Sequence, residues 1–172
     1  MLIDKLLEGT DVRLGIDYIR DRAALNELAE RVIFTGSIDE FYDFRLGRLE
    51  YRTVRFEHET LDMPDYQHNA VVNFTSAGVP WTRIIEHKHF ECLDNEAVRS
   101  NPQTVISREF SSEWTPGTEP FYPLNNQRNT SLYEQYEQLA RAEKNVLFGG
   151  RLAEYKYYNM DQVIEKAIQL PI

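Results

Sequence analysis

The chain has 172 residues, of which 42% are hydrophobic and 12% aromatic, so it can bury a substantial core and is neither disordered nor collagenous. Its formal net charge of −9 argues against nucleic acid and anionic membrane surfaces as partners, because both are bound through clustered Lys and Arg. No apolar run is long enough to cross a membrane and no secretory signal is visible. The lone Cys92 excludes an internal disulfide and fits a reducing compartment, so we expect a cytoplasmic protein.

The first part of the chain predicts short helices and strands in alternation, as in part of a parallel sheet. Gly9 is placed to end a first helix, and Ser37 with Glu40 has the spacing of a capping box. The expected elements are helices at 2–7, 22–31 and 38–44 and strands at 11–14 and 32–35.

The middle of the chain has a different pattern, in which apolar and polar residues alternate and the gaps have the length of turns. Strands of this kind favour an antiparallel sheet. They are expected at 50–60, 70–75, 82–91 and 104–110, and the polar segment 92–103 is expected to be a surface loop. Beyond them, Ser131 and Glu134 predict the start of a helix at 132–142.

The segment 145–168 combines a short apolar strand, a Gly149-Gly150 turn, several tyrosines and a helix capped by Asn159 with Gln162. Cofactor sites are built in this way, because glycines allow close approach and a helix start presents N–H groups to a ligand. A terminal strand, turn and helix that only close the core have the same pattern, and the pattern does not decide between them.

Two histidines raise the question of a metal site. On a strand at 82–91, Arg83, His87 and His89 would share one face. A metal needs further ligands, however, and Cys92 falls on the opposite parity, so hydrogen-bonded histidines are the favoured interpretation and no metal is expected. No motif for a serine or cysteine nucleophile is present.

Several arginines and tyrosines are candidates for contacts with a diphosphate, which the guanidinium fork suits. Ordinary surface ion pairs and packing explain them equally well. These candidates are Arg52, Arg83, Arg151, Tyr122, Tyr155 and Tyr157.

Segments in order along nearly the whole chain resemble bacterial UDP-galactopyranose mutases. They are FTGSIDEFYDFRLGRLEYRTVRFE, NAVVNFTSAGVPWTRIIEHKHFE, TVISREFSSEW, GTEPFYPLN and GGRLAEYKYYNMDQVI. Mutases of this family use reduced FAD to interconvert UDP-galactopyranose and UDP-galactofuranose, for the biosynthesis of cell-surface polysaccharides. The resemblance therefore implies a flavin-dependent isomerase acting on a nucleotide sugar.

The resemblance also implies roles for particular residues. Arg83 would neutralise the pyrophosphate of the substrate, and Tyr122 and Tyr157 would hydrogen-bond it. The implied substrate-binding residues are Arg83, Tyr122, Tyr157, Asn73 and Asn159. The implied FAD-contacting residues are Arg52, Gly150, Arg151, Met160 and Asp161.

The fold implied is mixed α/β or α+β, with an antiparallel substrate-domain sheet between remnants of a Rossmann-like FAD-binding domain. Residues 1–48 and 126–172 would belong to the FAD-binding domain, and residues 49–125 would form the substrate domain.

The sequence departs from the family because the G-x-G-x-x-G motif that cradles the FAD pyrophosphate is absent. We therefore expect the C-terminal half of a mutase, which alone neither retains FAD nor isomerises a sugar. A homo-oligomer or a complementing N-terminal half is an expected partner, because exposed apolar surface would need a cover. The alternative is a non-catalytic relic or module that binds nucleotide sugars or associates with itself.

Overall fold

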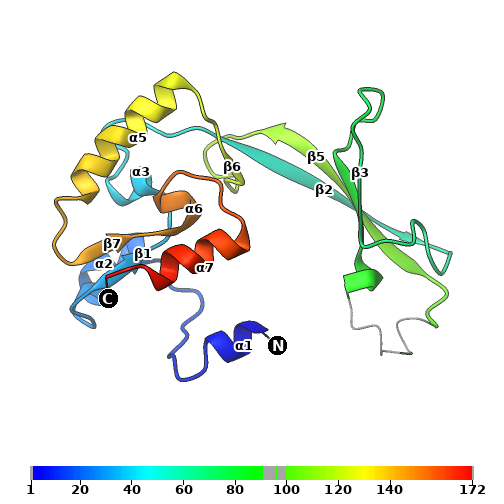
Figure 1. The fold of residues 1–172 in the computed structure, drawn as a ribbon, viewed down its shortest axis with the longest axis horizontal. Helices are drawn as coiled ribbons and strands as arrows, with labels where there is room; N and C mark the ends of the chain where they lie inside the picture. The colour runs from blue at the N-terminus through cyan, green and yellow to red at the C-terminus, as the bar shows by residue number, and fades with distance from the viewer. Residues whose placement is uncertain (1, 91–95, 97–99, 172) are drawn as a thin grey trace. The chain divides into compact units, whose positions relative to one another are not determined.

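The computed structural model describes residues 2–90, 96 and 100–171. The chain has a mixed α+β fold that divides into two compact units (Figure 1). Unit 1 combines residues 1–49 with residues 126–172, and unit 2 consists of residues 50–125.

Unit 1 is held together by a two-stranded parallel sheet in which β1 (Val32–Phe34) pairs with β7 (Val146–Phe148). The N-terminal segment also contributes α1 (Leu2–Leu6), α2 (Tyr18–Asn26) and α3 (Ile38–Phe41). The C-terminal segment contributes α5 (Gln127–Ala140), α6 (Gly150–Ala153) and α7 (Met160–Ile168). The strand pair therefore joins two segments that are far apart in the sequence.

The core of unit 1 is largely aromatic. The ring of Phe41 lies 5.0 Å from that of Phe34 and 4.8 Å from that of Phe148, measured between centroids. Tyr136 on α5 is fully buried, and its hydroxyl donates to the carbonyl of Gly47 at 2.7 Å and accepts from the N–H of Leu46 at 3.1 Å. This hydroxyl ties α5 to the segment that follows α3.

Unit 2 is a five-stranded antiparallel sheet in the order β3-β4-β5-β2-β6 (Figure 1). Its strands are β2 (Tyr51–Leu61), β3 (Val71–Asn73), β4 (Arg83–Glu86), β5 (Thr104–Glu113) and β6 (Tyr122–Pro123). The long strands β2 and β5 pair from Arg52 opposite Glu113 to Leu61 opposite Thr104. The antiparallel sheet expected from alternation is confirmed.

In unit 1 the sequence misplaced several boundaries. Residues 11–14 form no strand, α2 lies earlier than the expected helix at 22–31, and α3 ends at Phe41. The helix expected at 132–142 begins at Gln127, because Asn126 is its N-cap and accepts the N–H of Asn129 at 2.8 Å. The proposed cap Ser131 lies inside the helix.

In unit 2 the main error concerns the histidines. β4 ends at Glu86, and a 3₁₀ turn, η1 (His87–Phe90), follows it. The prediction that Arg83, His87 and His89 share one strand face is therefore wrong. Cys92 and most of the expected loop 92–103 lie outside the described residues.

The C-terminal predictions were more accurate. β7 and α7 form where the sequence places them, and Asn159 is the N-cap of α7. The Oε1 atom of Gln162 accepts the N–H of Asn159 at 2.9 Å, as a capping box requires. None of the helices in the described part of the chain has the length and apolar character needed to cross a bilayer.

Candidate functional site

One face of the unit 2 sheet gathers four of the residues singled out from the sequence. Asn73 pairs with Arg83 across β3 and β4, and Arg83 pairs with Glu109 across β4 and β5. Because directly opposed residues point to the same face, the register carries this face onward from Glu109 to Phe56 on β2. Arg52 has the parity of Phe56 on β2, and its partner on β6 is Tyr122. Asn73, Arg83, Arg52 and Tyr122 therefore lie on one face, which we call the polar face.

Arg83 is the half-exposed cation of the polar face, with 38% of its side chain accessible. Its Nε lies 3.1 Å from Oε1 of the nearly buried Glu109. That N–H makes no hydrogen bond to the carboxylate, whose Oε1 accepts from the hydroxyl of Thr82 at 2.7 Å. The attraction is therefore electrostatic, and it holds the Nε edge of the guanidinium group while 38% of the whole side chain remains accessible.

The sequence analysis missed Glu109. The alternating pattern of residues 104–110 indicates which face of the strand Glu109 occupies. Its pairing with Arg83, however, depends on the register between β4 and β5. No sequence spacing fixes that register.

Arg52 is fixed by a hydrogen bond from its Nη2 to the hydroxyl of Ser111 at 2.9 Å. Ser111 pairs with Val54 in the register of β2 and β5, so this contact independently places Arg52 on the polar face. Two guanidinium groups, a phenol and an amide on one open face form a surface suited to a phosphorylated ligand.

In unit 1 the remaining candidates lie in the segment from Gly149 to Asp161. Gly150 has a φ of +85°, a left-handed conformation that favours glycine, and it begins α6. The guanidinium of Arg151 lies 4.6 Å from the ring centroid of Tyr157, and Asn159 begins α7. The candidates that the structure places in this segment are Gly150, Arg151, Tyr155, Tyr157, Asn159, Met160 and Asp161.

This segment ends at a helix start that carries exposed side chains. The first helical residue, Met160, is 76% exposed. The N–H groups of the first turn and the partial positive charge of the helix start favour an anionic or hydrogen-bond-accepting ligand. The structure thus places the eleven candidates in two groups, one in each unit.

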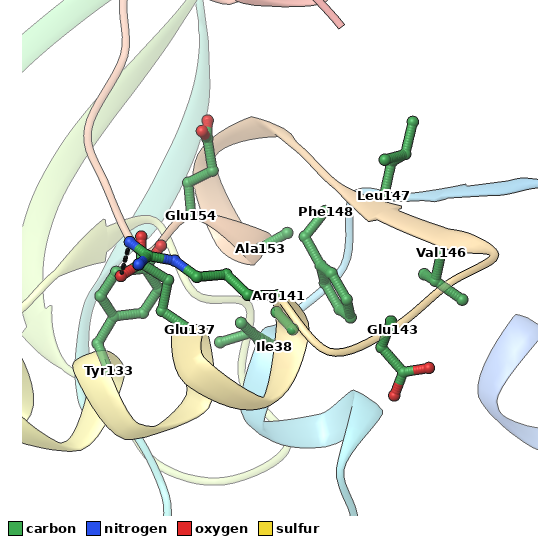
Figure 2. A pocket seen from close by; sticks show the side chains of 11 residues that line it. Ile38, Tyr133, Glu137, Arg141, Glu143, Val146, Leu147, Phe148, Ala153 and Glu154 are labelled. Atoms are coloured by element: carbon green, nitrogen blue, oxygen red, sulfur yellow. Dashed lines mark hydrogen bonds and ion pairs between the residues drawn. The ribbon is translucent and has the colours of Figure 1, made fainter. Parts of the chain in front are cut away.

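A separate hollow of about 270 Å³ lies in unit 1 between α5, β7 and α6, and sequence reasoning did not identify it (Figure 2). Tyr133 lies at its wall, and Arg141 pairs with Glu137 at 2.9 Å. Burial, together with the charges of Glu137 and Glu154, raises the pKa of Tyr133 to about 12. The phenol is therefore neutral at physiological pH.

Both histidines discussed above are hydrogen-bonded or ion-paired. The buried hydroxyl of Ser107 lies 2.5 Å from Nε2 of His87 and 2.6 Å from Nδ1 of His58. His89 Nε2 lies 3.3 Å from Oδ1 of Asp65 and 3.4 Å from Oε2 of Glu86. Both histidines thus have hydrogen-bonding partners within the chain.

Asp65, Glu86 and His89 form a cluster whose ligand atoms lie within 4.8 Å of one another. Glu86 is fully buried, and burial acts to raise the pKa of its carboxyl. Hydrogen bonds from Thr104 and from the N–H groups of Tyr66 and Gln67 outweigh this effect, so the pKa lies below its ordinary value. These contacts give the carboxylate a structural role in anchoring the 65–67 turn to β4.

The sequence profile of the UDP-galactopyranose mutases matches residues 1–157, which include both groups of candidates except for Asn159, Met160 and Asp161. This chain belongs to the UDP-galactopyranose mutase family.

Named relatives of this family agree with the match. A dTDP-fucopyranose mutase of Escherichia coli is 35% identical over 173 residues, covering 98% of this chain and 45% of the relative. A probable UDP-galactopyranose mutase of Klebsiella pneumoniae is 40% identical over 138 residues, covering 80% of this chain and 34% of the relative. A UDP-galactopyranose mutase of Mycoplasma genitalium is 36% identical over 154 residues, covering 84% of this chain and 36% of the relative. The chain thus spans less than half the length of these curated relatives.

Proposed function

We propose that this chain supplies part of the active site of a flavin-dependent nucleotide-sugar mutase, one that interconverts pyranose and furanose forms. The observation that carries the proposal is the polar face, where the sheet register brings together Asn73, Arg83, Arg52 and Tyr122. These residues are separated in the sequence, and their shared face supports a role for all four in one active site.

Within this proposal, Arg83 is the group that neutralises the diphosphate of the substrate. Glu109 holds the Nε edge of its guanidinium group, and the Arg83 side chain as a whole stays partly accessible. Tyr122 and Tyr157 donate hydrogen bonds to the diphosphate, and Asn73 and Asn159 contribute polar contacts to the sugar. A departing diphosphate is stabilised by such fixed donors, because they need little rearrangement as charge develops.

We assign the flavin contacts to Arg52 on unit 2 and to Gly150, Arg151, Met160 and Asp161 on unit 1. The left-handed Gly150 and the start of α7 fit a planar, anionic group, because the first permits close approach and the second presents N–H donors. Reduced FAD would supply nucleophilic chemistry at the anomeric carbon. The remaining steps assigned to this chain are binding, orientation and charge neutralisation.

The 172 residues contain no G-x-G-x-x-G motif, so they provide no cradle of that kind for the FAD pyrophosphate. We therefore propose that this chain by itself neither retains FAD nor turns over substrate. Residues 1–48 and 126–172 are proposed as parts of a Rossmann-like FAD-binding domain, and residues 49–125 as the substrate domain. A purified chain with flavin absorbance that isomerises a nucleotide sugar would overturn this part.

Two substrates can be compared directly, because one relative is a dTDP-fucopyranose mutase and others are UDP-galactopyranose mutases. UDP-galactopyranose is the proposed substrate, and dTDP-fucopyranose is the competitor. Ligand-observed NMR titration of this chain with UDP and dTDP measures which diphosphate binds more tightly. Tighter binding of dTDP would reassign the substrate.

The polar face is tested by Arg83→Ala, with Arg108→Ala as the matched control. Arg108 lies on β5 but on the opposite face, since it pairs with Glu57 rather than with Phe56. We expect Arg83→Ala to weaken UDP binding by about tenfold to a hundredfold, since a charge-assisted contact contributes about 1.5–3 kcal/mol, and Arg108→Ala to leave it unchanged. Equal losses in both variants would contradict the proposed site.

A second candidate, a non-catalytic module that associates with itself or with a complementing chain, is supported by α7. Met160 and Ile168 are 76% and 79% exposed, and Ile164 is half-exposed between them at helical spacing. Ile164→Asp would abolish association through this stripe without changing UDP binding to unit 2. The two functions are therefore separable by experiment.

A further inference from the structure

Three segments of unit 2 meet on the face of the sheet opposite the polar face. Glu86 has the opposite parity to Arg83 on β4, so its side chain points to that opposite face. The turn after β2 lies against it, because the N–H groups of Tyr66 and Gln67 donate to the carboxylate of Glu86. The 3₁₀ turn η1 follows β4 directly and brings His89 to the same place. The side chains gathered there are separate from the proposed substrate residues.

The side chains of Asp65, Glu86 and His89 offer one imidazole nitrogen and two carboxylate oxygens. Their ligand atoms all lie within 4.8 Å of one another. Calcium and magnesium prefer oxygen ligands alone, whereas zinc and its neighbours in the first transition series accept nitrogen and oxygen together. This donor set therefore favours a divalent transition-metal ion, for which zinc is a suitable probe.

The spacing around His89 fits ligands of one ion better than an optimal hydrogen bond. Its Nε2 atom lies 3.3 Å from Oδ1 of Asp65 and 3.4 Å from Oε2 of Glu86. Both distances exceed the value of about 2.9–3.0 Å that is usual for an N–H···O hydrogen bond. Two ligand atoms that each lie about 2.0–2.1 Å from a tetrahedral zinc ion are about 3.3–3.4 Å apart. The two measured separations match that spacing.

The charges around these side chains give independent support, because positive charge is lacking there. Glu86 is fully buried, and Asp65 is 30% exposed. In the described part of the chain neither carboxylate pairs with a lysine or an arginine, and the histidines beside them are charged only if protonated. The amine of Lys88 donates instead to the carbonyls of Pro64 and Asn101. Since buried carboxylates are normally paired with a cation or bound to a metal, this place is suited to a cation.

Both carboxylates are oriented by other hydrogen bonds. The hydroxyl of Thr104 donates to Oε1 of Glu86 at 2.7 Å, and the N–H of Gln67 donates to Oε2 at 2.9 Å. Oδ1 of Asp65 accepts the N–H of His68 at 2.8 Å. Partners of this kind orient metal ligands before the ion binds. Asp65 lies on a turn, so it is the ligand that can move toward Glu86 when an ion enters.

We propose that Asp65, Glu86 and His89 bind one zinc ion, with water in the fourth position of a tetrahedral site. The side chains of Asp65 and His89 are 30% and 23% exposed, so the ion can be reached from solvent. The ion joins the 65–67 turn and η1 to the end of β4 and stabilises unit 2. It takes no part in the chemistry of the polar face.

The histidine pair considered from the sequence does not form this ligand set. Because β4 ends at Glu86, the two rings reach different partners: His87 contacts Ser107, and His89 contacts Asp65 and Glu86. The turn after β2 supplies the ligand that no spacing along β4 predicts. His87 and His89 can therefore be tested against each other.

The test is a calorimetric titration of the chelator-treated chain with zinc sulfate. Wild type should bind one ion per chain at micromolar zinc. Asp65→Asn and His89→Gln should each weaken this binding by at least about tenfold, since losing even a supporting partner of a ligand costs about 10–100-fold. Zinc should also raise the urea midpoint of wild type, read from tryptophan fluorescence, but not those of the two variants.

Matched controls make the same changes at neighbouring positions. Asp62→Asn and His87→Gln should bind zinc as wild type does. Asp65→Asn keeps the oxygen that accepts from the N–H of His68, and urea unfolding without zinc checks that each variant is folded. Glu86 is left unchanged, because its hydrogen bonds hold the 65–67 turn.

Cobalt gives an independent readout of the geometry. Co²⁺ absorbs visible light strongly in a tetrahedral site and weakly in an octahedral one, so we expect strong bands that His89→Gln removes. The proposal is overturned if wild type binds no zinc, or if bound cobalt shows only weak bands. It is also overturned if His87→Gln abolishes zinc binding while His89→Gln does not. Loss of binding in Cys92→Ser would assign the ion to the thiolate and would equally overturn the three-residue site.

Discussion

Replacing Glu86 by Gln should destabilise unit 2 far more than its conservative chemistry suggests. The carboxylate is fully buried and accepts hydrogen bonds from the N–H groups of Tyr66 and Gln67, each at 2.9 Å, and from the hydroxyl of Thr104 at 2.7 Å. A carboxamide has one acceptor oxygen, so its NH₂ group would face a backbone N–H.

The magnitude follows from this mismatch. Losing one charge-assisted hydrogen bond costs about 1.5–3 kcal/mol, and leaving a buried donor without a partner costs about 1–3 kcal/mol. With partial relaxation of the turn, we expect a loss of about 3 kcal/mol in the free energy of unfolding. Glu113→Gln, an exposed change on β5, is the control and should stay within about 0.5 kcal/mol of wild type.

Urea unfolding followed by tryptophan fluorescence is suited to this measurement. The chain has two tryptophans, Trp81 and Trp114, and both lie in unit 2, so the signal reports that unit selectively. A loss for Glu86→Gln no larger than that for Glu113→Gln would refute the reasoning.

The pH dependence gives a second check on Glu86. Because the pKa of its carboxyl is lower in the folded chain than its ordinary 4.5, the stabilisation is present above the ordinary value. It is lost as the pH falls through the lower, folded-state pKa. The stability difference between wild type and Glu86→Gln should therefore narrow in acid, and a constant difference would contradict the assignment.

Three further predictions concern unit 1 and can be measured by far-UV circular dichroism during urea unfolding. Tyr136→Phe should cost about 1–2 kcal/mol, because it leaves the N–H of Leu46 and the carbonyl of Gly47 without their buried partner; an unchanged midpoint would contradict this role. Gly150→Ala should cost about 1 kcal/mol, since its φ of +85° disfavours a side chain while the nearest atom to an added Cβ, in Thr35, lies at an ordinary 3.7 Å. Asn126→Ala should cost about 1 kcal/mol, whereas Ser131→Ala should be nearly neutral, and the reverse order would restore Ser131 as the cap.

The parts of the fold that the sequence predicted depend on local patterns. Alternation located β2 and β5, and the spacing of Asn159 and Gln162 located the start of α7. Each signal is contained within a few neighbouring residues, so no distant contact was needed to recognise it.

The errors arose where a distant contact overrides the local pattern. The alternation of residues 83–91 continues past Glu86, but β4 ends there because His87 binds Ser107 on β5 and His89 contacts Asp65. Residues 11–14 have a strand-like composition but pair with no strand among the described residues. A strand is stabilised by its partner, which composition does not supply.

In the candidate site, too, local sequence patterns identify single residues, whereas distant contacts decide which of them lie together. The family resemblance named Asn73 and Arg83 separately, and only the register of β3, β4 and β5 shows that they lie side by side with Glu109. A shift of one residue in either pairing would move Arg83 to the opposite face.

The parallel pairing of β1 with β7 has a consequence for synthesis on the ribosome. Val32 emerges long before its partner Val146, and all of unit 2 is made between them. Unit 2 is contiguous, and its entry and exit are joined by the hydrogen bond from the N–H of Leu124 to the carbonyl of Glu50. Unit 2 can therefore fold while the chain is still being synthesised. In contrast, β1 and the aromatic residues around Phe41 remain uncovered until α5 and β7 have been made. During this interval the nascent chain exposes the most apolar surface to which chaperones can bind.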